Sequence, residues 1–246
     1  MDGAGIGVRL RAARERLGWS REQLAVQSGV SWSAIAQVES GRRTNVRPAT
    51  LSGLARALGV TIDYLVEGGA SSSTMLEHRA LVYDTDEQFT ATAGVFLAEG
   101  IERSEAAVAV TTRTNIALLR RHLGRDAGRI DFFDSGGWYD TPSSALEAYD
   151  TLLKAKLEAG ALWVRVVGEP VWAQRSEPEI RLWARYESLL NLVFGGSPMT
   201  VLCPYDERSV RPGIVKQACV THPATIGKQG LAASPEYVDP GRFALE

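Results

Sequence analysis

The feature that most constrains the fold of this 246-residue chain is a change of pattern at GGASSST, Gly68 to Thr74. Before this stretch, apolar residues recur three and four positions apart, as they do in amphipathic helices. After it, short apolar runs alternate with helical segments, which is typical of parallel strands joined by helices. The stretch itself is small, polar and aperiodic, as linkers are. We therefore predict an all-α domain at 1–67, a linker at 68–75 and an α/β domain at 76–246.

Charge is divided unequally between these two domains. Residues 1–68 contain nine arginines, no lysine and six acidic residues, whereas the remainder contains 18 basic and 23 acidic residues. A basic small domain joined to an acidic large one indicates that the small domain binds a polyanion. The only cysteines are Cys203 and Cys219, which form no disulfide framework and favour a reducing compartment. We expect a cytoplasmic protein with no membrane partner, since no apolar run approaches roughly 18 residues and the N-terminus does not resemble a signal peptide.

Short capped helices fill the first domain. Ser20 with Gln23 three residues later forms a capping-box pattern, and Ser31 precedes the next helix. Gly29 lies in the tight turn between these two helices, which is typical of a helix-turn-helix unit. The stretches SREQLAVQSGVSWSAIAQVESGRR and TLSGLARALGVTIDYL closely resemble the lambda-repressor/Cro-like (XRE) family of DNA-binding domains, over residues 5–67.

This resemblance implies that the helix after Ser31 enters the major groove of double-stranded DNA. Ile35 and Val38 share the core side of that helix, so we expect the outward face to carry Trp32, Ser33, Ala36 and Gln37. Gln37 aligns with a base-contacting position of the family, and a Gln amide suits adenine or a mixed base edge. We expect phosphate contacts from Arg21, Arg42, Arg43 and Arg47. Arg14 and Glu39 match a structural ion pair of the family. A protein-binding role is the alternative, but the arginine excess and the polar outward face favour DNA.

The second domain has an alternating pattern of strands and helices. Strands are expected at ALVY, AAVAVTT, RIDFFDS, ALWVRVVGE and MTVLCPYD, each followed by a helical segment. AAVAV and LWVRVV are apolar almost throughout, as strands buried on both faces are. The pattern predicts a three-layer α/β fold with a mainly parallel sheet. Ligands of such sheets bind beyond the carboxyl ends of the strands, where the sequence has these candidate ligand-binding residues: Tyr83, Asp84, Arg113, Glu169, Cys203, Tyr205 and Asp206.

The turn TTRTN, Thr111 to Asn115, stands where nucleotide-binding proteins have a phosphate loop. It lacks the glycines that let backbone N–H groups approach phosphate, and it lacks the lysine. We expect Thr114 to cap the following helix, with Arg113 able to assist one small anion. Motifs for a serine nucleophile or a zinc protease are absent too, so we expect no enzyme. A degenerate domain that still binds or hydrolyses nucleotide is the first alternative function, and a protein-interaction scaffold is the second.

A second resemblance covers residues 76–240. VRVVGEPVW, YESLLN, VLCPYDER, THP and SPEYV, in this order, resemble the sensory domain of DcmR-type regulators, called the MEDS domain. The resemblance implies a RecA/KaiC-like domain without a phosphate loop, found in bacterial regulators and proposed to sense small hydrocarbon derivatives. The family's opening His-x-Cys motif reads His78-Arg79-Ala80 here, so its cysteine is absent. A ligand-responsive transcription regulator follows from the two resemblances, and a homodimer would match two DNA half-sites.

Charged residues also fall within apolar patterns of the α/β domain. Arg165 lies inside a buried strand and Glu187 lies on the apolar side of its helix, so we predict that Arg165 pairs with Glu187 or with Glu169. The alternative is a buried polar cluster beneath a small-molecule pocket roofed by Trp172 and Tyr186.

Two histidines and the two cysteines raise the question of a metal. A zinc site would need His78, His222, Cys203 and Cys219 to converge, and their spacing is not diagnostic. We therefore predict no metal site and no cofactor. His222 is expected to fix the turn after its helix or to donate a hydrogen bond into the pocket, and we include His78 and His222 among the candidate ligand-binding residues.

Overall fold

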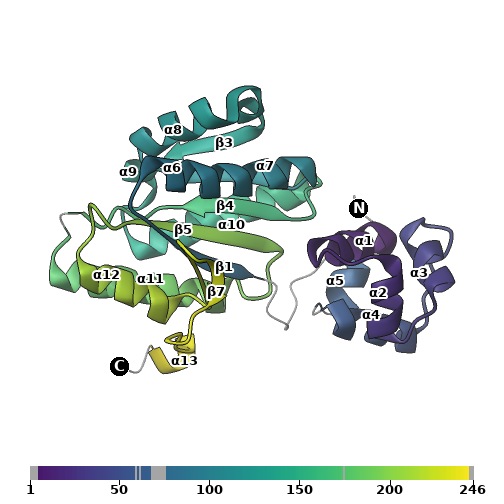
Figure 1. Cartoon of the computed structure of the whole chain (residues 1–246). Coiled ribbons are helices and arrows are strands. Elements are labelled where there is room, and N and C mark those ends of the chain that lie inside the picture. Colours follow the sequence, from purple (N-terminus) through teal and green to yellow (C-terminus); the bar gives the residue numbers. More distant parts are fainter. Residues whose placement is uncertain (1–4, 59, 61, 68–75, 174, 244–246) are drawn as a thin grey trace. The chain divides into compact units, whose positions relative to one another are not determined.

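The computed structural model describes residues 5–58, 60, 62–67, 76–173 and 175–243 (Figure 1). Its contacts divide the chain into two compact units, one formed by residues up to 75 with Gly195–Pro198 and the other by 76–194 and 199–246. The predicted linker at 68–75 lies outside the described residues. We describe the two units separately.

The first unit consists of helices. They are α1 (Ile6–Arg16), α2 (Arg21–Ser28), α3 (Trp32–Glu39), α4 (Pro48–Leu58) and α5 (Ile62–Glu67). The predicted capping box begins α2, where the Gln23 N–H donates to Ser20 Oγ at 3.2 Å and the Ser20 N–H donates to Gln23 Oε1 at 2.7 Å. Gly29 ends α2 with a φ of 69°, a left-handed conformation that favours glycine. The predicted helix-turn-helix fold is therefore confirmed.

The second unit is built on a seven-stranded sheet. Its strands are β1 (Glu77–Tyr83), β2 (Ala106–Thr111), β3 (Ile130–Asp134), β4 (Val164–Gly168), β5 (Met199–Asp206), β6 (Ala224–Gly227) and β7 (Gly230–Ala233). The strand order is β3-β2-β4-β5-β1-β6-β7, and every neighbouring pair is parallel except β6 and β7. The mainly parallel sheet is as predicted. The β6–β7 hairpin was not predicted, because its four-residue strands are exposed or half-buried and lack the apolar run of a central strand.

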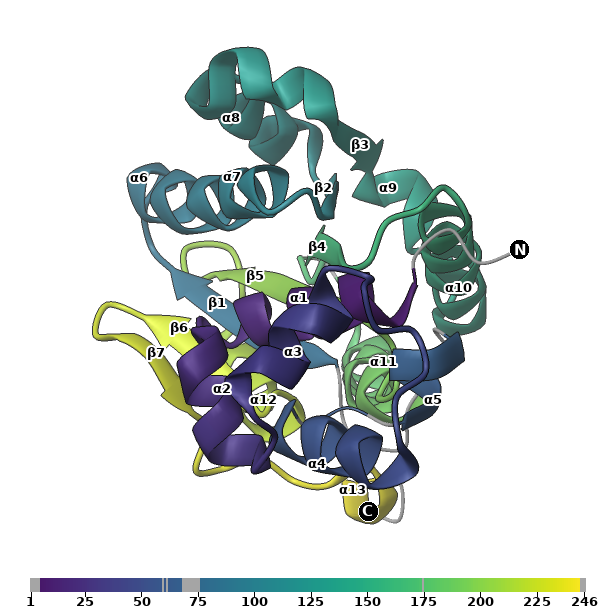
Figure 2. The same ribbon diagram turned by 90° about the vertical axis from the view of Figure 1, so that its right-hand side faces the viewer.

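Helices cover both faces of this sheet (Figure 2). One face is covered by α6 (Asp86–Phe89), the π-helical turn η1 (Thr90–Gly94), α7 (Val95–Glu102) and α8 (Arg113–Leu123). The other face is covered by α9 (Ser135–Trp138), α10 (Pro142–Glu158), α11 (Glu177–Val193) and α12 (Pro212–Thr221). Two short elements complete the unit, η2 (Gly124–Arg129) and α13 (Pro240–Phe243). Across the described ranges, no helix is both long enough and apolar enough to cross a bilayer.

The strand order reverses direction between β2 and β4. The chain leaves β2 toward β3 on one side and leaves β4 toward β5 on the other. The helices that follow, α8 and α11, cover opposite faces of the sheet. This reversal is the place where ligands bind in open α/β sheets. The fold therefore has two candidate regions for ligand binding. One lies at the carboxyl ends of β2 and β4, and the other is the core beneath α11 and α12.

Candidate functional site

Helix α3 presents a polar face to solvent. Trp32 is 48% exposed, Ser33 and Gln37 are exposed, and Ala36 is half-buried. Ile35 and Val38 are fully buried on the opposite side, where they pack in the core of the helical unit. The outward orientation expected for these four residues is therefore observed, and their contacts with DNA remain a prediction.

The buried carboxylate of Glu39 holds α3 against α1 and α2. Arg14 donates to it from Nε at 2.6 Å and from a second nitrogen at 3.0 Å, so the expected ion pair is present. Arg21 also donates to Glu39, at 2.7 Å, which directs its Nε toward the protein. Burial alone would raise the pKa of Glu39, but these hydrogen bonds outweigh it and leave the pKa lowered.

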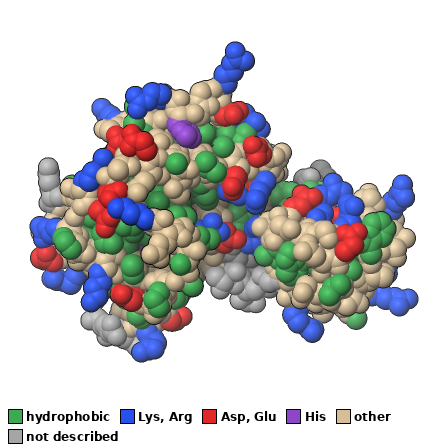
Figure 3. All heavy atoms as spheres, viewed as in Figure 1, with side chains coloured by type: hydrophobic (Ala, Val, Ile, Leu, Met, Phe, Trp, Pro, Cys, Tyr) green, Lys and Arg blue, Asp and Glu red, His purple; other side chains and the backbone are tan. Residues whose placement is uncertain are grey.

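The other three candidate phosphate ligands lie just after α3. Arg42 and Arg47 are exposed, and Arg43 is half-buried with its Nε donating to the Asn45 carbonyl at 3.4 Å. The space-filling view shows arginine side chains projecting from several points of the helical unit (Figure 3). The long side chains after α3 are thus free to reach an anionic surface beside this helix.

The turn after β2 surrounds the side-chain carboxylate of Glu169. Glu169, just after β4, accepts hydrogen bonds from Thr111 Oγ1, from the Thr112 N–H at 3.3 Å and from Asn115 Nδ2 at 2.8 Å. Burial is the main reason why the pKa of Glu169 is raised. Thr112 and not Thr114 caps α8, because the helix begins two residues earlier than a cap at Thr114 would place it. The place beyond the carboxyl ends of β2 and β4 where a phosphate would lie is thus occupied by the Glu169 carboxylate.

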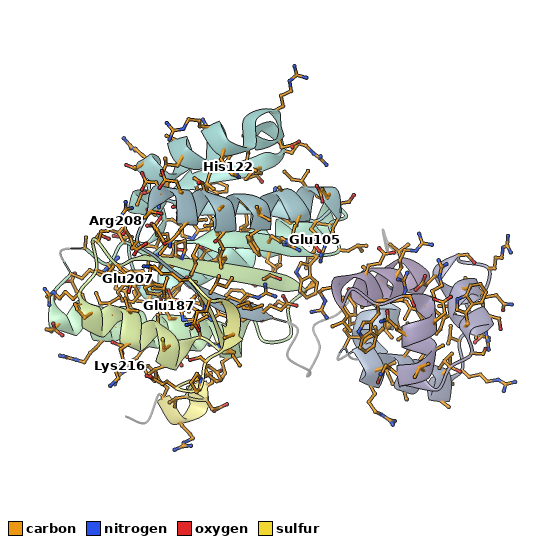
Figure 4. All side chains as sticks on the ribbon, in the orientation of Figure 1. Glu105, His122, Glu187, Glu207, Arg208 and Lys216 are labelled. Atoms are coloured by element: carbon orange, nitrogen blue, oxygen red, sulfur yellow. The ribbon has the colours of Figure 1, made fainter. Side chains whose placement is uncertain are left out.

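Other candidates at the carboxyl ends of the strands are paired with neighbouring groups. Asp84 accepts from Lys228 at 2.6 Å, and this hydrogen bond is the main reason why the pKa of Asp84 is lowered. Arg113 pairs with Asp134 at 2.5 Å. Asp206 pairs with Arg208 at 2.8 Å; Figure 4 labels Arg208.

Tyr83 lies deeper, at the end of β1. Its hydroxyl oxygen accepts from Asn115 Nδ2 at 3.4 Å, and burial raises the pKa of Tyr83. The carboxylates of Asp84, Asp134 and Asp206 at the carboxyl edge of the sheet are thus each paired with a Lys or Arg of the same unit.

The predicted pairing of Arg165 with Glu187 or Glu169 is wrong. Arg165 instead donates to Glu105, to Glu99 at 3.2 Å and to the Phe96 carbonyl at 3.0 Å. Successive side chains of a strand point to opposite faces, and Arg165 points to the α7 side whereas Glu187 comes from α11 on the other side. Figure 4 shows Glu105 and Glu187 well apart. Glu169 shares the face of Arg165 but lies four residues away, about 13 Å along the strand direction.

Four polar side chains converge in the core beneath α11 and α12. They are His78 from β1, Glu187 from α11, Cys203 from β5 and His222 from the end of α12, and each is at most 2% exposed. One nitrogen, oxygen or sulfur atom from each lies within 4.8 Å of the others. His78 Nε2 is 3.3 Å from both Cys203 Sγ and Glu187 Oε2. Glu187 Oε2 is 3.6 Å from Cys203 Sγ and 3.6 Å from His222 Nε2. We call these four residues the buried cluster.

Hydrogen bonds on the outer side orient both imidazoles. Asn191 Nδ2 donates to the Thr221 carbonyl at 2.9 Å, so its Oδ1 faces His78 Nδ1 at 3.1 Å as an acceptor. His222 Nδ1 lies 2.9 Å from the Ala218 carbonyl, which can only accept. Nδ1 of each ring therefore carries a proton, and in the neutral ring Nε2 has a lone pair that is directed into the buried cluster.

The charge state of the buried cluster follows from its burial. Burial, with a smaller effect of His78, lowers the pKa of His222, and burial followed by the charge of Glu187 raises the pKa of Cys203. No Lys or Arg in the described ranges forms an ion pair with Glu187. Buried polar atoms without a hydrogen-bond partner gather here, including Glu187 Oε1 and His222 Nε2.

A small cavity borders the buried cluster. It has room for about one water molecule, and its lining includes Glu187, Cys203 and three tyrosines, Tyr139, Tyr149 and Tyr186. The hydroxyls of Tyr139 and Tyr149 bond each other, whereas the Tyr186 hydroxyl has no hydrogen-bond partner. The site thus combines apolar walls with a few convergent polar groups, as small-molecule sites do.

The predicted ligand-binding residues fall into separate groups. His78, Glu187, Cys203 and His222 meet in the buried cluster, and Tyr186 lines its cavity. Tyr205 packs edge-on against His222 at 5.7 Å, and Trp172 stacks on Tyr205 at 5.7 Å. Tyr83, Asp84, Arg113, Glu169 and Asp206 lie instead at the carboxyl edge of the sheet, and Arg165 lies beneath α7. The sequence analysis missed Asn191, although it follows Glu187 by one helical turn and shares its side of α11.

Comparison with known proteins identifies two family models that match this chain. The model described as the MEthanogen/methylotroph, DcmR Sensory (MEDS) domain matches residues 77–223, and a helix-turn-helix model matches residues 10–65. Both resemblances seen in the sequence are confirmed by these matches.

One curated relative and one solved structure each cover less than a third of this chain. The HTH-type transcriptional repressor RghR of Bacillus subtilis (strain 168) is 38% identical over 75 residues, which are 30% of this chain and 56% of that protein. The chain therefore spans just over half the length of this curated relative. A crystal structure of the P22 c2 repressor protein in complex with synthetic operator 9T in the presence of Tl⁺ is 33% identical. It covers 27% of this chain and 98% of that chain, with a TM-score of 0.26.

Proposed function

Because the chain belongs to the family of the MEDS sensory domain, and its N-terminal unit matches a helix-turn-helix model, we propose that it is a ligand-responsive transcription regulator. The helical unit binds double-stranded DNA in a sequence-specific way. The α/β unit binds a small molecule, and this binding changes the affinity for DNA. The protein acts without catalysing a reaction. The observation that carries the proposal is the polar, exposed face of α3. The opposite face of this helix is buried in the core, and exposed arginines follow the helix in the chain.

We assign Gln37 to base contacts and the arginines after α3 to phosphate contacts. Gln37 projects an amide from the middle of the exposed face of α3, and an amide can bond the edge of a base in two places. Arg42 and Arg47 come after α3 and not from its exposed face, so we assign them to phosphates. The relative that matches this part of the chain is named a transcriptional repressor, which supports a role in transcription.

Two substitutions test this division by fluorescence anisotropy on a selected DNA site. Gln37→Ala should narrow the difference in affinity between the selected site and a scrambled one, by about 1–3 kcal/mol. Arg42→Ala should weaken binding to both DNAs alike and lower the slope of log affinity against log salt by about 1. Arg56→Ala on α4 is the matched control, since Arg56 is an exposed arginine away from α3. Identical behaviour of the Gln37 and Arg42 variants would refute this assignment of contacts.

The small-molecule site is the cavity beside the buried cluster, which has room for about one water molecule and has to widen to admit a short-chain ligand. Its apolar walls and its unpaired Tyr186 hydroxyl suit a small molecule with one polar group and an apolar body. Binding is measured by thermal shift of the full chain with short-chain alcohols, aldehydes and halogenated hydrocarbons. Tyr186→Phe should weaken any stabilisation by the molecule that binds, whereas Tyr237→Phe, outside the cavity, should not. Stabilisation that persists unchanged in Tyr186→Phe would place the ligand elsewhere.

Dimerisation would connect ligand binding to DNA binding. Helix α11 exposes four apolar side chains, namely Leu182, Leu189, Leu192 and Val193, which are 38–56% exposed. Contiguous exposed apolar residues favour a protein interface, and a two-fold dimer fits two half-sites. Leu192→Glu should shift the full chain from dimer to monomer in analytical ultracentrifugation, and Leu231→Glu on the exposed strand β7 serves as the control. A monomeric wild-type chain would contradict this part of the proposal.

Nucleotide binding is the less supported alternative. Glu169 already accepts the hydrogen bonds that the turn after β2 offers, and its charge would repel a phosphate. Stabilisation of the full chain by millimolar ATP with magnesium would favour this alternative, and its absence would remove it.

A further inference from the structure

We propose that the buried cluster of His78, Glu187, Cys203 and His222 is a binding site for one divalent transition-metal ion, with Zn²⁺ as the best fit. The residue types suit this ion, because zinc in proteins is bound by imidazole nitrogen, thiolate sulfur and carboxylate oxygen. The site lies inside the α/β unit and is independent of the DNA-binding face.

The spacing of the atoms matches tetrahedral coordination. With Zn–N and Zn–O near 2.1 Å and Zn–S near 2.3 Å, ligand atoms in a tetrahedron are separated by about 3.4–3.6 Å. Four of the six separations in the buried cluster are close to these values: 3.3 Å for His78 Nε2 to Cys203 Sγ and to Glu187 Oε2, and 3.6 Å for Glu187 Oε2 to Cys203 Sγ and to His222 Nε2. The other two, from His222 Nε2 to His78 and to Cys203, are at most 4.8 Å, so the four atoms surround a point that a zinc ion fits once His222 moves inward as needed.

The surroundings hold the imidazoles as metal ligands are held. A metal-bound histidine usually donates its other N–H to a carbonyl, amide or carboxylate, which fixes the ring and its tautomer. His78 Nδ1 has Asn191 Oδ1 at 3.1 Å, and His222 Nδ1 has the Ala218 carbonyl at 2.9 Å. Asn191 is itself held by the Thr221 carbonyl at 2.9 Å. Both Nε2 lone pairs are thus directed at the same point.

With neutral imidazoles, the hydrogen-bond inventory of the buried cluster does not close. When each ring has its proton on Nδ1, the inward atoms are two Nε2 acceptors and a carboxylate that can only accept. The Cys203 thiol then supplies the only proton that points into the buried cluster, so acceptors face acceptors at 3.3 Å and 3.6 Å. A divalent ion would turn this repulsion into coordination, and it would balance the charges of Glu187 and a Cys203 thiolate.

The location of the site links it to the proposed sensing role. Glu187 and Cys203 also line the tyrosine cavity, so a metal here would lie beside the space that we propose for the small molecule. Only this connection between the metal and the small molecule rests on the proposed function. The metal site itself is inferred from the geometry of the buried cluster alone.

Metal refolding tests the site directly. The full chain is unfolded in the presence of a chelator, refolded with or without Zn²⁺, desalted and analysed for bound metal. We expect about one Zn²⁺ per chain and a rise in the unfolding temperature of the α/β unit, because metal binding is coupled to folding. Refolding with Co²⁺ should give the visible absorption of a tetrahedral ion and a thiolate-to-cobalt charge-transfer band in the near ultraviolet.

The chain supplies matched controls, since it has only three histidines and two cysteines. Cys203→Ser should abolish the charge-transfer band and His222→Gln should weaken metal binding, whereas Cys219→Ser and His122→Gln should change neither. Asn191→Ala should weaken binding by about 10- to 100-fold, as loss of a group that orients a ligand does. Co²⁺ bound by the wild-type chain without a thiolate band would overturn the proposal, and this holds even if a variant fails to fold. Metal content that falls equally in the control variants, or that is absent from the wild-type chain, would also overturn it. A failure of small-molecule binding with one metal still bound would instead refute the sensing role.

Discussion

Replacing Glu39 by Gln should be among the most destabilising single changes in the helical unit. The two side chains have nearly the same volume, so the cost arises from charge and hydrogen bonding rather than from a cavity. Glu39 is 4% exposed and accepts from Arg14 and Arg21, which tie α1 and α2 to α3. Removing one partner of a buried ion pair typically costs 3–5 kcal/mol.

The structure indicates a loss near the lower end of that range, about 3 kcal/mol. Arg14 keeps two other acceptors in the variant, the Trp19 carbonyl at 2.7 Å and Glu15 at 3.2 Å. The complementary change Arg14→Met should cost less, because Glu39 still pairs with Arg21 at 2.7 Å. The double variant Arg14→Met/Glu39→Met removes both buried charges and should recover most of the stability.

Native-state hydrogen exchange of α1–α5 peptides in the full chain measures these free energies separately from the α/β unit. Because the pKa of Glu39 is lowered in the folded chain, its contribution should be present above the pKa of an unfolded glutamate, about 4.3, and should be lost as pH falls below it. A loss below about 1 kcal/mol in Glu39→Gln, or a double variant less stable than Glu39→Gln, would refute the role of this carboxylate.

Three further changes probe packing and charge elsewhere. Gly7→Ala would bring its Cβ within 2.0 Å of the Val38 carbonyl oxygen, so urea unfolding should show strong destabilisation, whereas Gly5→Ala meets open space and should be nearly neutral. In the wild-type chain the raised pKa of Glu169 means that the free energy of unfolding falls as pH rises from about 4.3 through the pKa of the folded chain. Glu169→Gln should flatten this pH dependence, because the amide does not ionise. An unchanged pH profile would contradict this. Gly168→Ala would place its Cβ 2.8 Å from a buried tyrosine hydroxyl of the cavity, so it should lower thermal stability and disturb small-molecule binding; normal binding would count against the cavity as the site.

Local patterns predicted most of the elements. The strand expected at MTVLCPYD coincides with β5, since a continuous apolar run with both faces buried leaves little freedom in its bounds. The capping box at Ser20 determined where α2 begins. The β6–β7 hairpin was not predicted, because its short exposed strands lack the run of apolar residues that marks a buried strand.

The candidate site depended on information that a single sequence does not contain. His78 and Cys203 lie 125 positions apart and meet because β1 pairs with β5. That adjacency is a property of strand order, which no local pattern specifies. The same limitation produced the wrong pairing of Arg165, whose partner depends on which helix covers its face of the sheet.

Selection of DNA from a random pool by the full chain tests the central claim most directly. The wild-type chain should enrich one sequence motif, in two half-sites about one helical turn apart if the chain is dimeric. The Gln37→Ala variant should lose preference at one base pair of each half-site while retaining the rest of the motif. A wild-type chain that enriches no sequence, at salt concentrations where it still binds DNA, would contradict the claim that α3 reads DNA.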